Sequence, residues 1–202
     1  MSELIEANVR EERRARARAD RTDRLLSASA GVVAVSALVV SIYQTYITRE
    51  QQKMSVWPYL TLAHSQSGGD TATYEFRVGN EGVGPALVGS VEVLADRKPR
   101  GSWGAVAQAF GVSLSGGEGV QQSYYSSFHR GSVVLPGTDK MLLSMRGPAS
   151  MTYWRAAQTR FRMRVCYCSL YGDCWLNDSE ADQPAPVPAC ERMPAASVWE
   201  ED

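Results

Sequence analysis

Apolar residues are concentrated in one long run near the start of the chain. Residues 25–48, "LLSASAGVVAVSALVVSIYQTYIT", form a stretch of 24 residues without a charged side chain. As an α-helix this stretch would be roughly 36 Å long, and the hydrocarbon core of a bilayer is about 30 Å thick. No later window repeats the pattern. The sequence therefore predicts a single transmembrane helix over residues 25–48.

A cleaved signal peptide is the competing interpretation, because "ASA" at residues 28–30 has the small side chains of a cleavage site. This triplet lies at the start of the apolar run, whereas a cleavage site follows the apolar core. The run is also longer than the roughly 7 to 15 apolar residues that are typical of a signal peptide. The pattern favours an uncleaved signal anchor.

Basic residues indicate the orientation of this helix. Seven arginines precede it: Arg10, Arg13, Arg14, Arg16, Arg18, Arg21 and Arg24. Only Arg49 and Lys53 follow it closely. Cytoplasmic flanks of membrane helices are enriched in Lys and Arg. We therefore expect a single-pass protein of the inner (cytoplasmic) membrane with a cytoplasmic N-terminus, whose C-terminal domain is periplasmic or extracellular.

An aromatic belt is expected near the outer end of the helix, formed by Tyr43, Tyr46, Trp57 and Tyr59.

Residues 1–24 predict a cytoplasmic, arginine-rich helical stem, and residues 49–55 a juxtamembrane connector. The stem lacks Gly and Pro and has acid-first pairs at i, i+4, such as Glu6 with Arg10 and Asp20 with Arg24. Attraction to anionic lipid or nucleic acid is one interpretation of its arginines. The nearly balanced charge favours a solvated stem instead, and we expect no nucleic-acid partner.

Small and weakly polar residues recur along the predicted membrane helix at two positions of a seven-residue repeat. They are Ser27, Ala30, Ala34, Ala37, Ser41 and Gln44, and the same spacing continues to Thr48. Such a stripe lets a second helix approach closely and offers it hydrogen-bond partners. We expect this packing face to contact either another membrane protein or a second copy of the chain, in addition to the lipid bilayer.

Residues 56–178 have the period-two alternation of β-strands, interrupted by Gly and Pro. In "TYEFRVGN" Tyr74, Phe76 and Val78 share one face. In "RFRMRVCYCSLY" one face carries Phe161, Met163, Val165 and Tyr167. Further strands are expected over residues 56–63, 87–94, 120–126, 132–135, 140–145 and 174–177.

Two short helices are expected among the strands. "SWGAVAQAFG" places Trp103, Val106 and Phe110 on one side, with Ser102 as a candidate N-cap. "SMTYWRAAQ", from Ser150, has a similar pattern. Both are expected to cover open ends of a β-sandwich rather than to bind a cofactor.

The turn motifs of the exported domain resemble those of bacterial immunoglobulin-like domains of the cell-adhesion-related class. The resemblance depends on "NEGVGPA" and "VLPG", and its residues are Asn80, Gly82, Gly84, Pro85, Ala86, Leu135, Pro136 and Gly137. With one N-terminal span, the chain also resembles uncharacterised membrane-anchored bacterial proteins. The resemblance covers residues 57–177 and departs from the simple pattern at residues 101–130. It implies a mainly-β immunoglobulin-like sandwich behind a single transmembrane helix.

Four cysteines in an exported domain favour disulfide bonds. Cys166 and Cys168 lie too far apart on an extended strand to pair with each other. If "SLYGD" is a five-residue hairpin loop, Cys168 faces Cys174 across the strand pair, and Cys166 pairs with Cys190. A four-thiolate zinc site and a thiol redox centre are the alternatives. The spacing lacks the usual C-x2-C of zinc sites.

The tail, residues 179–202, is rich in Pro and acidic residues and predicts an extended strap. It is expected to be ordered at Cys190 if that cysteine is bridged. Val198 and Trp199 are candidates for docking on the domain. Disorder of the terminus is the favoured prediction.

No residue pattern in the chain predicts catalysis, a metal site or a cofactor. His64 and His129 lack the neighbours of a base or a ligand, and "SGGEG" at residues 115–119 lacks the Lys-Ser/Thr ending of a phosphate loop. Arg160, Arg162 and Arg164 form a stripe that is either an anion-binding face or a solvated surface. We expect a non-enzymatic, membrane-anchored interaction or accessory module of an envelope complex. The alternative is a component of an enzyme or transport complex whose active site needs other chains.

Overall fold

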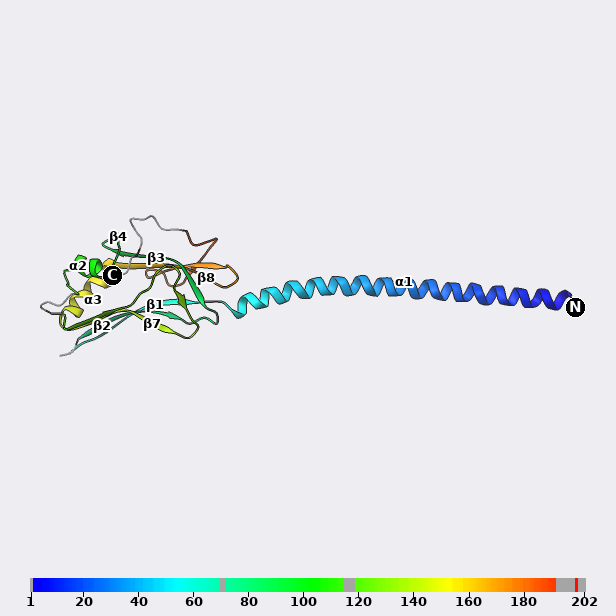
Figure 1. Ribbon diagram of the computed structural model, residues 1–202, viewed down its shortest axis with the longest axis horizontal. Helices are drawn as coiled ribbons and strands as arrows, with labels where there is room; N and C mark the ends of the chain where they lie inside the picture. Colours follow the sequence, from blue (N-terminus) through cyan, green and yellow to red (C-terminus); the bar gives the residue numbers. More distant parts are fainter. Residues whose placement is uncertain (1, 70–71, 115–118, 192–198, 200–202) are drawn as a thin grey trace. The chain divides into compact units, whose positions relative to one another are not determined.

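The computed structural model describes residues 2–69, 72–114, 119–191 and 199 of the chain (Figure 1). It divides into two compact units, Met1–Gln52 and Lys53–Asp202. The first unit is helical, and the second is a mostly-β domain that contains two sheets.

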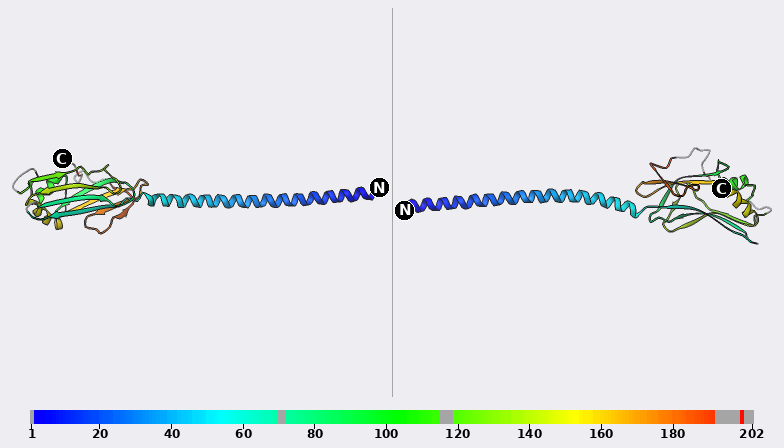
Figure 2. Two further views of the ribbon diagram at one scale, coloured as in Figure 1. Left: turned by 90° about the horizontal axis from the view of Figure 1, so that it is seen from below. Right: turned by 180° about the vertical axis from the view of Figure 1, so that it is seen from behind.

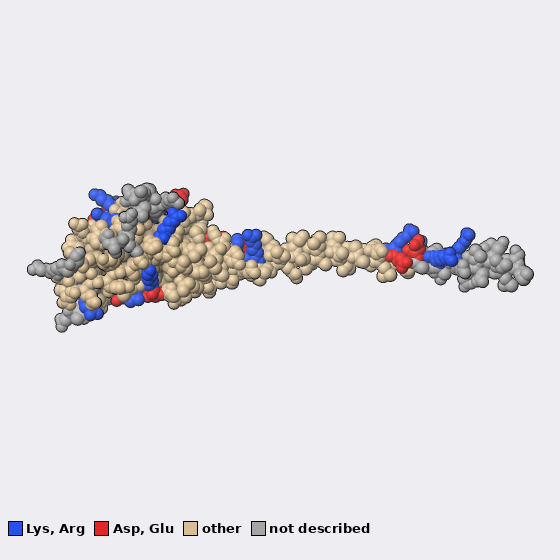
Figure 3. All heavy atoms as spheres, viewed as in Figure 1, with Lys and Arg blue, Asp and Glu red and all other residues tan. Residues whose placement is uncertain are grey.

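The first helix, α1, is one element that runs from Ser2 to Ser55. Its segment Asp20–Ser55 is, within the described part of the chain, the one helix long and apolar enough to cross a membrane. Figure 3 shows the uncharged run of α1 bounded by charged side chains on both sides. Arg24 donates a 2.9 Å hydrogen bond to Asp20, as the i, i+4 spacing predicts. The segment over residues 49–55, expected as a juxtamembrane connector, lacks Gly and Pro and continues the helix.

The first sheet has four antiparallel strands in the order β1-β2-β7-β5. Its strands are β1 (Leu60–Ser67), β2 (Thr73–Asn80), β7 (Asp139–Arg146) and β5 (Gln122–Tyr125). β1 and β2 pair without interruption from Leu60 opposite Asn80 to Ser67 opposite Thr73. Residues 56–59, expected to begin the first strand, lie before it: β1 starts only at Leu60, after Pro58.

The second sheet has six antiparallel strands, with β10-β9-β8-β3-β4 in order and β6 paired to β3. Its strands are β3 (Ala86–Ala95), β4 (Lys98–Arg100), β6 (Val133–Val134), β8 (Phe161–Cys168), β9 (Cys174–Asp178) and β10 (Ala185–Val187). β4 and β10 are not among the strands expected from the sequence. Since β10 comes from the tail and pairs with β9, the domain extends beyond the expected boundary at residue 178.

The hydrophobic core lies between the two sheets, as the alternation along the strands predicts. Tyr74, Phe76 and Val78 of β2 are fully buried, and their neighbours in sequence are half-buried. β8 alternates in the same way from Phe161 to Val165. Figure 2 shows the sheets as separate layers. Burial of alternate apolar side chains from both sheets is the main stabilising contribution to such a domain.

Two helices lie at the end of the domain opposite to the start of β1 (Figure 1). α2 (Trp103–Ala109) begins where expected, and the Ser102 hydroxyl accepts a hydrogen bond from the backbone N–H of Ala105. α3 (Ala149–Arg160) leads directly into β8. Their buried residues include Trp103 and Tyr153, so both helices add to the core.

One residue near the C-terminus contradicts the favoured prediction that the terminus is disordered. Trp199 is 5% exposed, and its ring centroid lies 4.9 Å from that of Trp103 in an edge-to-face contact. Val198, the other docking candidate, lies outside the described residues.

Candidate functional site

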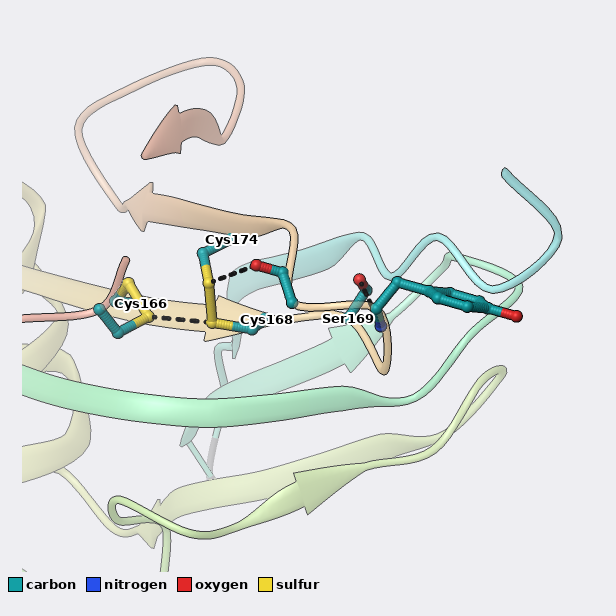
Figure 4. The surroundings of a disulfide bond; sticks show 7 residues. Cys166, Cys168, Ser169 and Cys174 are labelled. Carbon is teal, nitrogen blue, oxygen red and sulfur yellow. Dashed lines mark hydrogen bonds between the residues drawn. A yellow bond between two sulfur atoms is a disulfide. The ribbon is translucent and has the colours of Figure 1, made fainter. Parts of the chain in front are cut away.

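The β8–β9 hairpin holds three of the four cysteines (Figure 4). Cys168 lies opposite Cys174 in the strand register and is bonded to it, with a Cα–Cα distance of 4.0 Å. Cys166 is bonded to Cys190 of the tail, with a Cα–Cα distance of 5.5 Å. These bonds join the same cysteines as the pairing expected from the sequence. They close the hairpin and fix the tail to β8.

The two disulfides are in contact with each other. The Sγ atoms of Cys168 and Cys190 lie 3.6 Å apart, although these residues belong to different bonds. The Sγ atoms of Cys168, Cys174 and Cys190 all lie within 4.8 Å of one another. Sulfur binds zinc as a thiolate, so in this bonded state the cluster has no thiolate to offer a metal. Thiol–disulfide exchange is the chemistry that this geometry favours.

A glycine on the neighbouring strand makes room for the bond to the tail. The register between β3 and β8 shifts between Val88 and Ser90, around Gly89. A Cβ atom on Gly89 would lie 2.4 Å from Cβ of Cys190. No side chain larger than hydrogen fits here without moving the cysteine, so the sequence of β3 is adapted to the position of the tail.

Asn80 connects three segments at the end of the domain where the chain enters at Val56. Its side chain is 1% exposed. Oδ1 accepts hydrogen bonds from the backbone N–H groups of Tyr59 and Gly82, at 3.1 and 3.0 Å. Nδ2 donates to the carbonyl groups of Gly84 and Val134, at 2.8 and 2.9 Å. All four hydrogen-bonding positions of this amide, two on the oxygen and two on the nitrogen, are therefore used within the protein.

Two glycines of the same loop lie directly against the segment that enters the domain. A Cβ on Gly82 would be 2.4 Å from the carbonyl oxygen of Trp57, and one on Gly84 would be 1.8 Å from that of Val56. The loop also donates backbone hydrogen bonds from Val83 and Gly84 to Trp57. The entering segment "VWPYL", residues 56–60, is thus in contact with the motif "NEGVGPA" on which the resemblance depends. Sequence reasoning interpreted "NEGVGPA" as a turn and residues 56–63 as a strand, and it missed the contact between them.

The arginine stripe does not form a free cationic surface. Arg160 makes two hydrogen bonds to Asp96, at 2.6 and 2.7 Å. Arg162 binds Asp178, at a shortest distance of 2.6 Å. Arg164 binds Glu92, at 3.1 Å.

These ion pairs also change the titration of the arginines. Hydrogen bonding to its carboxylate raises the pKa of both Arg160 and Arg162. The expected anion-binding face is not supported, because every guanidinium of the stripe already has an acidic partner. Exposed pairs of this kind contribute little to stability.

A surface cavity of about 680 Å³ adjoins this stripe. It is lined by Leu94, Asp96, Arg97, Thr159, Arg160, Arg162 and Glu180. Both signs of charge are present, and two of its three arginines pair with carboxylates of the same wall, Arg160 with Asp96 and Arg162 with Glu180. The lining therefore has no single charge that would select a ligand.

His64 is packed among aromatic rings and is poorly placed for catalysis. Its Nδ1 lies 2.7 Å from the Tyr74 hydroxyl, and its ring centroid lies 4.5 Å from that of Phe76. Burial lowers the pKa of His64 from 6.5 to about 4, so the imidazole is neutral at pH 7. His129 is exposed, and its Nδ1 lies 2.7 Å from the carbonyl oxygen of Arg130. The Ser132 hydroxyl accepts a hydrogen bond from the backbone N–H of His129, at 3.1 Å.

The expected packing face of α1 lies on a continuous helix, from Ser27 to Gln44. All its side chains are exposed in the single chain. Thr45 and Ser36 use their hydroxyls within the helix, donating to the carbonyl groups of Ser41 and Val32. The contact of this face with a second helix stays a prediction.

Comparison with protein-family models, with curated proteins and with solved structures finds no match to this chain.

Proposed function

We propose that this protein is a membrane-anchored interaction or accessory module. α1 crosses the inner membrane once with its N-terminus in the cytoplasm, and the β-domain is displayed on the other side. The observation that carries the proposal is a helix long and apolar enough to span a membrane, Asp20–Ser55, followed by a domain with two disulfides. Disulfides persist in oxidising compartments, and the excess of arginine before the span favours this orientation.

The immunoglobulin-like fold of the domain is part of the proposal. Its support is the strand order, β1-β2-β7-β5 in one sheet and β9-β8-β3-β4 within the other. Numbered along the chain, these orders correspond to A-B-E-D and G-F-C-C′ of an immunoglobulin sandwich. Such sandwiches serve many binding functions, so the fold is compatible with an interaction role without naming the partner.

The proposed partner in the membrane is another helix. The stripe of small residues on α1 would let a second helix, from another protein or a second copy, pack closely against Ala30, Ala34 and Ala37. Together with the β-domain, this contact would make the chain a subunit of an oligomeric or multi-protein envelope complex.

The orientation is tested by labelling intact cells with a membrane-impermeant maleimide. We expect a cysteine that replaces Lys98, the exposed first residue of β4, to be labelled in intact cells. A cysteine that replaces Ser2 should be labelled only after the membrane is permeabilised. The reverse pattern would overturn the proposed orientation, and labelling of both in intact cells would exclude a membrane-spanning chain.

The membrane contact is tested by crosslinking. A cysteine that replaces Ala34 should form a crosslink in native membranes, whereas one that replaces Val33, on a different side of the helix, should not. The mass of the product distinguishes a second copy from a foreign protein. Absence of any product at Ala34 would contradict the assembly role.

A further inference from the structure

Exposed apolar side chains gather at the end of the β-domain where the chain enters. Among the described residues, this entry-end patch consists of Trp57, Val83, Leu135, Leu170 and Tyr171, each between 43% and 63% exposed. Leu87 and Val133, also exposed, pair with each other next to it. Elsewhere in the described part of the unit Lys53–Asp202 the large exposed hydrophobic residues are Met54, Tyr124 and Tyr125.

The patch is assembled from four separate segments. The carbonyl oxygen of Trp57 accepts hydrogen bonds from the backbone of Val83 and Gly84. Asn80, the last residue of β2 before this loop, donates to the carbonyl group of Val134, which directly precedes Leu135.

The hairpin tip completes the patch. Leu170 and Tyr171 lie in the loop that follows Cys168, and Cys168 pairs with Leu87. Leu87 in turn pairs with Val133. Side chains from the entry segment and three loops therefore share one end of the domain, which Figure 1 shows opposite to α2 and α3.

The length of the chain brings this end close to the proposed membrane surface. The uncharged run ends at Thr48, and α1 continues as a helix to Ser55. Seven helical residues span only about 10 Å. The polar headgroup layer on one side of a bilayer is roughly 5 to 7 Å thick. The domain therefore begins at the outer edge of the headgroups, within reach of exposed loop tips.

The composition of the patch fits the interface of a bilayer. Trp and Tyr prefer the headgroup level, and Leu and Val bury their apolar surface beside it. Nearby charges are of both signs, with Glu81 exposed and Lys53 3.9 Å from Asp173. Electrostatic attraction to anionic lipid therefore contributes little to the binding of this patch to a bilayer. We expect the patch to bind zwitterionic and anionic membranes equally.

We propose that the entry-end patch inserts its loop tips into the outer headgroup layer of the membrane that α1 spans, so that the β-domain is held against the bilayer. This inference depends on the proposed membrane anchoring. Its occupant is lipid, and a second protein covering the same residues is the outcome that would refute it.

The test uses the full chain reconstituted in vesicles of phosphatidylcholine. A fluorescent label is attached to a cysteine that replaces Val83 or Leu135, and lipids with a nitroxide near the headgroup act as quencher. The matched control carries the label at Lys98, the exposed first residue of β4. We expect quenching at residues 83 and 135 to be at least about twofold greater than at residue 98, with a similar result when anionic phosphatidylglycerol is added.

Three results distinguish the inference from the proposed anchoring. If the chain does not float with the vesicles, the anchoring itself fails. If it floats and quenching at residues 83 and 135 equals that at residue 98, only the insertion of the loop tips is wrong. If these labels are shielded from both lipid nitroxide and aqueous iodide, a protein surface covers the patch, and the lipid contact is likewise refuted.

A second variant is designed to prevent insertion of the loop tips while the labelled residue stays the same. Leu170→Glu places a charge on an exposed tip, where it costs the fold little but disfavours contact with the interface. Quenching at Val83 should then fall toward the value at Lys98. Tyr124→Glu, exposed outside the patch, should leave it unchanged, and equal effects of the two variants would contradict the inference.

Discussion

Gly89 lies directly against Cys190: a Cβ atom added to the glycine would be 2.4 Å from Cβ and 2.8 Å from Sγ of the cysteine. The contact joins the middle of β3 to a residue of the tail about a hundred positions later. The bond between Cys166 and Cys190 therefore holds the tail against the sheet at a position where β3 has no side chain. The disulfides are thus part of the packing of this domain.

Gly89→Ala should interfere with the bond to the tail. The added methyl group would displace Cys190, so a large fraction of the protein should contain free Cys166 and Cys190. Loss of this bond should lower the free energy of unfolding by about 2–4 kcal/mol. Alkylation of free thiols, followed by mass spectrometry, measures the first effect, and chemical denaturation the second. Gly68→Ala is the control, because a Cβ there meets nothing within 4 Å; equal behaviour of the two variants would contradict the argument.

Asn80→Asp should destabilise the domain more than its small change in shape suggests. The new carboxylate oxygen would face the carbonyl oxygens of Gly84 and Val134, which now accept hydrogen bonds from Nδ2. Two buried hydrogen bonds are replaced by repulsion, so the free energy of unfolding should fall by at least about 2 kcal/mol. Denaturation followed by tryptophan fluorescence measures the loss. Glu81→Gln, at the exposed neighbouring position, should change stability by less than about 0.5 kcal/mol.

The stability of the domain should decrease in mild acid because of His64. The folded state holds the pKa of this residue at about 4 by burial, whereas the unfolded chain titrates near 6.5. Below pH 6.5 the unfolded chain therefore binds a proton that the folded chain does not, so stability falls as the pH decreases from 6.5 to about 4. The full effect is at most about 3 kcal/mol.

Unfolding free energies at several pH values test this titration. His64→Phe keeps an aromatic ring beside Phe76 and cannot titrate, so its stability should be less dependent on pH between 6.5 and 4. An unchanged slope in this variant would assign the acid sensitivity to other groups.

The features that sequence reasoning predicted correctly are those set by local pattern. The strands around Phe76 and Met163 follow from period-two alternation, and α2 follows from Ser102 and the spacing after it. The hairpin register follows from five residues between Cys168 and Cys174. In each case the residues that determine the structure are neighbours along the chain.

The features that sequence reasoning missed depend on contacts between distant segments. Trp199 lies in a tail whose composition indicates disorder, yet it is buried with the core of the domain and contacts Trp103. The arginine stripe was visible, but its carboxylate partners, such as Asp96 for Arg160, lie far away in the sequence. The contact of the Gly84 loop with Val56 is of the same kind. Periodicity carries no information about such pairs.

The contact between the two disulfides predicts exchange when one bond is opened. In Cys174→Ser the thiol of Cys168 is free and lies 3.6 Å from Sγ of Cys190. Its thiolate should attack Cys190, forming a Cys168–Cys190 bond and releasing Cys166 as the thiolate, with no net oxidation or reduction. The purified variant should therefore contain two isomers, with the free thiol on Cys168 in one and on Cys166 in the other.

Alkylation at neutral pH and chymotryptic mapping would distinguish these isomers, because cleavage after Tyr167 separates Cys166 from Cys168. Cys166→Ser provides the reciprocal case, in which Cys190 should attack Cys168 and release Cys174. Modification of Cys168 alone in the first variant, and of Cys190 alone in the second, would show that the sulfurs do not exchange. Label on Cys166 and Cys174 would instead show that the hairpin and the tail share a single interchangeable set of bonds.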